Sequence, residues 1–162
     1  MKRVWILLTV IFLTGLTALP TQAATDSITV NPFAILNNFC IVDYEHTVNG
    51  DGSINLSSGT YQSSSDGTIG YTLGAGFKQY FDSDAQGGRY LGISATYYDV
   101  DQGHHIWAVD EGKAVAITLD YGYRYIADSG FTLELGLSGG IYKQDDDNRL
   151  ILTARAQAGY GW

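Results

Sequence analysis

The C-terminal segment 149–162 alternates between apolar residues and polar or small residues. One face of an extended chain would carry Leu150, Leu152, Ala154, Ala156, Ala158, Tyr160 and Trp162, and the other Thr153, Arg155, Gln157, Gly159 and Gly161. A period of two predicts a β-strand. A strand that is apolar on one side and ends on an aromatic residue is typical of the closing strand of a bacterial outer-membrane barrel, so Tyr160 and Trp162 are the candidate assembly signal.

Four more segments share this alternation, and they span residues 68–81, 90–98, 114–126 and 131–142. Their apolar faces carry large aliphatic and aromatic residues, whereas the opposite faces are dominated by Gly, Ser and Thr. A solvated face would be rich in Lys and Glu, so small polar residues favour the crowded interior of a narrow barrel over a soluble sandwich. No window after residue 24 shows a helical period, so the pattern indicates an all-β chain.

The number of strands follows from the connections. Segments 27–36 and 39–47 also alternate, and Asn37–Asn38 is predicted as the tight turn between them. Both termini of an outer-membrane barrel lie in the periplasm, so the strand number is even. Segment 53–62, entered through the turn 49–52, supplies the eighth strand, while Pro32 removes a hydrogen-bond donor from the first. The sequence therefore predicts an eight-stranded antiparallel up-and-down transmembrane β-barrel.

The N-terminus predicts export through a cleaved signal peptide, residues 1–23. Lys2 and Arg3 precede an apolar stretch that is short for a membrane span, and small residues surround Ala23. Removal of the first 23 of the 162 residues leaves 139, which predicts one barrel domain at 24–162. The single cysteine, Cys40, is predicted on the lipid-facing side and can form no disulfide within the chain.

The segment 1–23 contains two basic residues and no acid, so its removal lowers the formal net charge from −8 to −10. Such acidity argues against binding to nucleic acid. The predicted outer loops, 99–112 and 143–148, hold seven of the acids, at positions 99, 101, 110, 111, 145, 146 and 147. The predicted periplasmic turns are 82–88 and 127–130. Much of the negative charge is therefore expected at the cell surface.

The stretch Tyr121–Gly136, followed by Gly139–Tyr142, resembles a strand-turn-strand unit of small outer-membrane barrels in the family called domain of unknown function 3575. Segments 30–33 and 43–45 are similar to the opening strands of that family, so the resemblance spans most of the mature chain. In size and layout the chain is also similar to the OmpX and Ail adhesion barrels, although it lacks a match to their long outer loops. The resemblance implies a fold and a location, and no activity.

Seven charged residues are predicted to point into the barrel: Asp43, Glu45, Lys78, Asp120, Arg124, Glu134 and Arg155. Four acids against three bases is nearly balanced, which favours a network of ion pairs that fills the lumen, with the two arginines compensating Asp120 and Glu134. The alternative is a path for protons or ions. An eight-stranded barrel is just wide enough for side chains to fill it, so we favour the structural network.

His104 and His105, beside several acids in the loop 99–112, are the candidates for chemistry at the outer rim. Adjacent histidines on an extended chain point in opposite directions, which disfavours a shared metal site. A lipid-modifying enzyme, such as the known lipid A deacylase and palmitoyltransferase barrels, would need a serine and an acid near one histidine, and no serine motif is evident. We therefore expect no catalytic, metal or cofactor residues and no cofactor.

The sequence thus predicts a non-catalytic integral protein of the Gram-negative outer membrane with a filled lumen, in a structural or surface-interaction role such as adhesion or envelope integrity. Its expected partners are outer-membrane lipids, lipopolysaccharide, the barrel assembly machinery and a surface ligand of unknown kind. The alternatives are an outer-leaflet lipid-modifying enzyme that uses His104 or His105, and a pore for small solutes.

Overall fold

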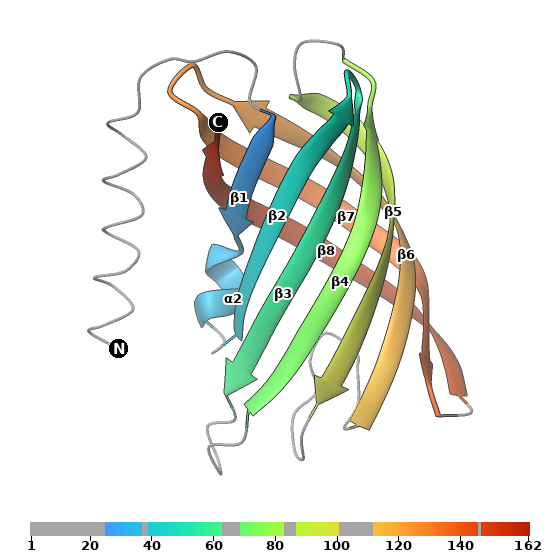
Figure 1. Ribbon diagram of the computed structural model, residues 1–162. Helices are drawn as coiled ribbons and strands as arrows, with labels where there is room; N and C mark the ends of the chain where they lie inside the picture. Colours follow the sequence, from blue (N-terminus) through green and yellow to red (C-terminus); the bar gives the residue numbers. More distant parts are fainter. Residues whose placement is uncertain (1–24, 37–38, 63–68, 83–86, 101–111, 146) are drawn as a thin grey trace.

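The computed structural model describes residues 25–162 except 37–38, 63–68, 83–86, 101–111 and 146. The predicted signal peptide lies outside the described residues. Eight antiparallel strands close into a barrel in which each strand pairs with its neighbour in the chain and the last pairs with the first (Figure 1). They are β1 (Asp26–Val30), β2 (Phe39–Asn49), β3 (Gly52–Gln62), β4 (Ile69–Tyr80), β5 (Gly88–Val100), β6 (Gly112–Ile126), β7 (Phe131–Gln144) and β8 (Asp147–Gly161). The predicted fold class, an eight-stranded up-and-down barrel, is confirmed.

The two faces of the barrel wall reverse the usual distribution of residues in a water-soluble protein. Large apolar side chains point outward and are exposed, including Leu119 at 62%, Leu135 at 65% and Leu152 at 80%. Charged and polar side chains point inward, and Glu134 is fully buried. Isolated apolar residues are normal on a protein surface, but a continuous outer belt of them is not. Among the described residues, none of the helices combines the length and the apolar character needed to cross a membrane.

The first strand is shorter than predicted. It ends at Val30, and residues Pro32–Leu36 form a short helix, α2, so the expectation of a strand to Leu36 was wrong. Proline cannot donate to a strand ladder but is well tolerated in the first turn of a helix. The Asn31 side chain stabilises that turn, because its Oδ1 accepts hydrogen bonds from the backbone N–H groups of Phe33 and Ala34, both at 3.0 Å. The predicted turn Asn37–Asn38 lies outside the described residues.

Helix α2 occupies a place in the wall that a longer β1 would fill. Strand β1 pairs with β8 only from Ser27↔Gly161 to Val30↔Ala158. Beyond that level α2 lies beside β2 and β8 (Figure 1). Ala34 on its inner side is 1% exposed, whereas Phe33 is 59% exposed. The helix therefore closes the seam with one small residue inward and one large apolar residue outward.

The cap on α2 gives a first testable prediction. Asn31→Ala removes the acceptor for two helical N–H groups at a buried position, so the free energy of unfolding is expected to fall by about 1 kcal/mol. Urea unfolding in lipid vesicles measures this change. Asn31→Ser is the matched control because a serine hydroxyl also caps a helix, and it should lose less stability. If the two variants lose equal stability, the cap is not the source of the effect.

One connection differs in detail from the sequence-based prediction, and another agrees with it. Strand β7 extends to Gln144 and β8 begins at Asp147, so the predicted loop 143–148 is a tight hairpin. Asp145 turns the chain with a φ of 51°, a conformation that aspartate tolerates better than most residues. At the opposite end, the predicted turn 127–130 is confirmed: Gly130 has a φ of 85° and its N–H donates to the carbonyl of Ala127 at 2.8 Å.

The chain end completes the barrel. The backbone carbonyl of Trp162 accepts hydrogen bonds from the N–H groups of Thr25 and Asp26 at 2.9 and 3.0 Å, and its own N–H donates to the carbonyl of Asp26 at 2.9 Å. The rings of Tyr160 and Trp162 stack with centroids 6.4 Å apart. The backbone hydrogen bonds of the final residues thus join the end of β8 to the start of β1.

Deletion of Gly161 and Trp162 is therefore expected to impair closure of the barrel, because it removes the hydrogen bonds that join the two chain ends. The measurement is the fraction of expressed protein that migrates as a compact band without heating and shifts on boiling. Trp162→Phe keeps the backbone bonds and an aromatic ring, so it should retain most of this fraction. A normal fraction of compact protein from the truncated gene would contradict the prediction.

Candidate functional site

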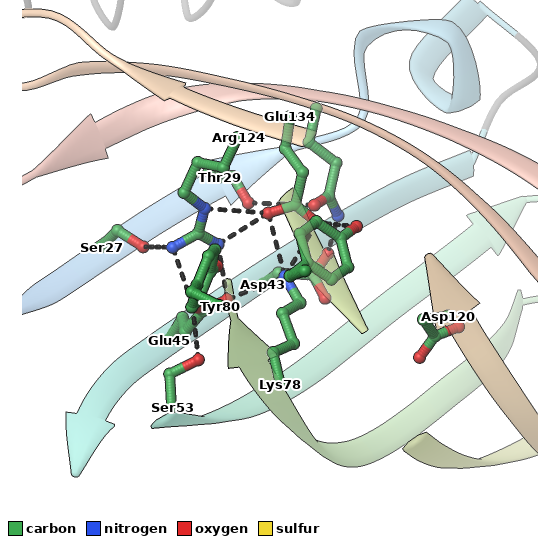
Figure 2. Close-up of polar contacts among 12 residues, drawn as sticks. Ser27, Thr29, Asp43, Glu45, Ser53, Lys78, Tyr80, Asp120, Arg124 and Glu134 are labelled. Carbon is green, nitrogen blue, oxygen red and sulfur yellow. Dashed lines mark hydrogen bonds and ion pairs between the residues drawn. The ribbon is translucent and has the colours of Figure 1, made fainter. Parts of the chain in front are cut away.

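The candidate site is a four-charge cluster in the lumen, formed by Glu45, Lys78, Arg124 and Glu134 (Figure 2). Strands β2, β4, β6 and β7 supply one residue each, and every one is at most 4% exposed. Lys78 Nζ lies 2.8 Å from a carboxylate oxygen of Glu45 and of Glu134. Arg124 also bridges both acids, with Nη1 2.8 Å from Glu45 Oε1 and Nη2 2.7 Å from Glu134 Oε2. Two cations and two anions therefore neutralise one another.

Hydroxyl groups complete the hydrogen bonding of this cluster. Tyr80 and Ser53 each donate to Glu45 Oε1 at 2.7 Å, and Tyr90 donates to Glu134 Oε1 at 2.8 Å. The cations also lie over aromatic rings: Lys78 Nζ is 4.7 Å from the centroid of Tyr90. Buried charges are tolerated when they are paired and their remaining acceptors are satisfied, and this cluster meets both conditions.

Sequence analysis did not assign Tyr80 and Tyr90 to the site. Glycines on the facing strands make room for Tyr90, because a Cβ atom at Gly122 or Gly136 would lie 2.5 or 2.7 Å from its hydroxyl oxygen. These two glycines face each other across β6 and β7. A pair of glycines at matching positions of neighbouring strands was thus the signal that a large side chain crosses the lumen there.

The other three predicted lumen residues make hydrogen bonds and ion pairs of their own. Arg155 Nη2 is 3.3 Å from Asp120 Oδ1, and Asp120 is separated from the four-charge cluster in Figure 2. Asp43 forms no ion pair among the described residues and accepts a hydrogen bond from the Gln157 amide. The expected compensation of Asp120 and Glu134 by two arginines thus has a definite pairing: Arg155 with Asp120, and Arg124 with Glu134 and Glu45.

Between the cluster and the far end of the barrel lies a polar cavity of about 130 Å³, here called the lumen chamber. It is lined by Asp43, Asn55, Thr72, Asp120 and Arg155, among others. Beyond it an apolar cluster fills the lumen, made of Ala34, Phe39, Ala114, Ala116, Tyr142 and Ile151. The described lumen therefore has three layers, which are charged, polar with a cavity, and apolar.

Exposed polar contacts at the end of the barrel where β1 begins and β8 ends are weaker features. His46 Nδ1 lies 2.9 Å from Asp26 Oδ1, and the histidine side chain is 53% exposed. In the turn after β4, the guanidinium of Arg89 donates to Asp82 at 2.8 and 3.1 Å and holds the pKa of this carboxyl down to about 2. Exposed pairs of this kind contribute little to stability.

The candidates for catalysis, His104 and His105, lie outside the described residues. Within the described part of the chain, no cluster of three His, Cys, Asp or Glu residues has the geometry to hold a metal ion. Cys40 is exposed on the outer face and free. The site that the structure describes is thus a network of fixed charges.

The outer face of the wall carries a shallow groove of about 620 Å³. Its lining residues include Tyr121 and Tyr123 of β6, Leu135 and Leu137 of β7, Ala154 and Ala156 of β8, and Phe33 of α2. Small residues beside aromatic residues produce this depression, which is large enough for part of a hydrocarbon chain.

Comparison of the chain with known protein families, characterised proteins and solved structures finds no match.

Proposed function

We propose that this protein is an integral outer-membrane barrel that performs no catalysis, has a filled lumen, and acts in a structural or surface-interaction role. The observation that carries the proposal is the distribution of side chains across the barrel wall. Leucine, isoleucine and tyrosine are exposed on the outside, and charged residues are buried inside. A bilayer is the solvent that such an outer face suits, and a closed barrel leaves no strand edge unpaired in lipid. The partners proposed for this face are outer-membrane lipids and lipopolysaccharide, and assembly would use the barrel assembly machinery.

The layers of the lumen argue against the alternative of a solute pore. Four charges bonded to one another occupy the interior at one level, and the apolar cluster packs inside it at another. The chamber between them measures about 130 Å³. A conducting path would require the ion pairs to separate and the apolar side chains to move apart.

The second candidate function is a lipid-modifying activity that uses His104 or His105 at the outer rim. The groove over Ala154 and Ala156 could hold part of an acyl chain, but it reaches Arg89 at the end of β5 opposite to the loop of the two histidines. Lipid A mass spectra from cells with and without the gene separate the candidates, because an enzyme would change the acyl composition and a non-catalytic barrel would leave it unchanged.

The proposed role is tested by comparing binding of cells to host matrix and their resistance to detergent, with and without the gene. Loss of binding or of envelope integrity, with unchanged lipid A and no conductance in planar bilayers, is the expected result. Stepwise conductance from purified protein would favour the pore, and a change in lipid A would favour the enzyme.

A further inference from the structure

The charges of the lumen do not balance once they are assigned to partners. Glu45 and Glu134 are neutralised by Lys78 and Arg124, and Asp120 is neutralised by Arg155. Every inward charge among the described residues then has an opposite partner except Asp43. One negative charge therefore remains at a residue that is only 7% exposed.

The group in direct contact with Asp43 is a neutral donor, and the cation that lines the same chamber, Arg155, is paired with Asp120. The Thr29 hydroxyl donates to Gln157 Oε1 at 3.4 Å, and the Gln157 amide nitrogen donates to Asp43 Oδ2. This chain fixes the orientation of the Gln157 amide but supplies no positive charge. An unpaired carboxylate in a buried site is costly unless a proton or a cation neutralises it.

The lumen chamber beside Asp43 contains polar groups that have no partner in the described protein. Asn55 is 5% exposed, lines the chamber, and its carboxamide has no hydrogen bond to any described residue. The same is true of the hydroxyl of Thr72, which is 4% exposed. Nearly all buried polar groups in proteins are satisfied by protein, water or an ion. The orphaned Asn55 amide is thus a second, independent sign that something polar occupies the chamber.

We propose that the lumen chamber binds one alkali-metal cation, Na⁺ or K⁺, together with water, through Asp43 and the amide oxygen of Asn55. Carboxylate, amide and hydroxyl oxygens are hard ligands that suit such ions and not the softer transition metals. The surplus of one charge matches a monovalent ion. A volume of about 130 Å³ accommodates the ion and several water molecules.

The experiment is urea unfolding of the purified full chain in vesicles at constant ionic strength, with NaCl or KCl exchanged against the bulky cation N-methyl-D-glucamine. Binding of one cation to the folded state raises the folding equilibrium constant about tenfold for each tenfold rise in cation above its dissociation constant. Asp43→Asn is expected to abolish this dependence, because the variant has no surplus charge. Asn55→Ala should shift the dependence to higher cation concentration.

Asp128→Asn is the matched control, since it removes the same charge at an exposed turn residue and should keep the full dependence. If wild-type stability is the same in all three salts, or if Asp43→Asn keeps the wild-type slope, the proposal is wrong and a proton neutralises Asp43. Crystals grown with rubidium provide a test independent of variant folding: an anomalous peak in the chamber beside Asp43 is expected, and a chamber without one would overturn the proposal.

Discussion

Arg124→Leu is expected to lower the free energy of unfolding by about 3–5 kcal/mol, the range for removing one partner of a buried ion pair. Arg124 bridges Glu45 and Glu134, and both carboxylates are almost completely buried. Without the guanidinium, Lys78 alone must compensate two anions. Urea unfolding in vesicles measures the loss.

A double-mutant cycle tests whether the loss comes from the network. Addition of Glu45→Gln to Arg124→Leu removes the uncompensated charge together with its partner, so part of the stability should return. Arg89→Leu is the control for loss of an arginine, because its pair with Asp82 is exposed and should matter little. Additive effects of the two lumen changes would show that these residues do not act as one network, and would favour a conduction path instead.

Leu135→Arg should destabilise the barrel by about 2–4 kcal/mol if the outer face lies in lipid, since that is the cost of an arginine near the bilayer midplane. Leu135 is on the outer face of β7 and is 65% exposed. A substitution at such a position in water would change stability by at most about 0.5 kcal/mol. Folding titrations in vesicles therefore distinguish the two solvents.

Leu135→Ala is the matched control because it shortens the side chain without adding charge, and it should cost less than the arginine variant. A second control is Lys143→Arg, which leaves a cation at an exposed position of β7 near its end. Equal free energies of unfolding for Leu135→Ala and Leu135→Arg would show that Leu135 does not face lipid.

The strand pattern made the fold predictable because alternation requires only that one face differ from the other. It identified all eight strands, including the weakly apolar β3, since an even number was required. It failed at Pro32–Leu36, where apolar residues in a row are compatible with either a strand or a helix. Only the capping contact of Asn31 and the missing donor of Pro32 decide for the helix.

The candidate site was partly predictable for a related reason. The alternation along each strand shows which side chains point into the barrel, so the seven inward charges could be identified from the sequence. Which of these charges form ion pairs depends on strand tilt and register. Arg124 reaches Glu45 of β2, 79 residues away in sequence, and no local pattern reveals such a contact. Ile151 also points inward, on the face of the last strand that was predicted to be polar, and it packs in the apolar cluster with Ala34 and Phe39.

Fractionation of cells that express the full chain tests the central claim most directly. The account predicts that the protein sediments with the outer membrane, resists extraction by urea or carbonate, and migrates as a compact band until it is boiled. Recovery of the folded protein from the soluble periplasmic fraction would contradict it.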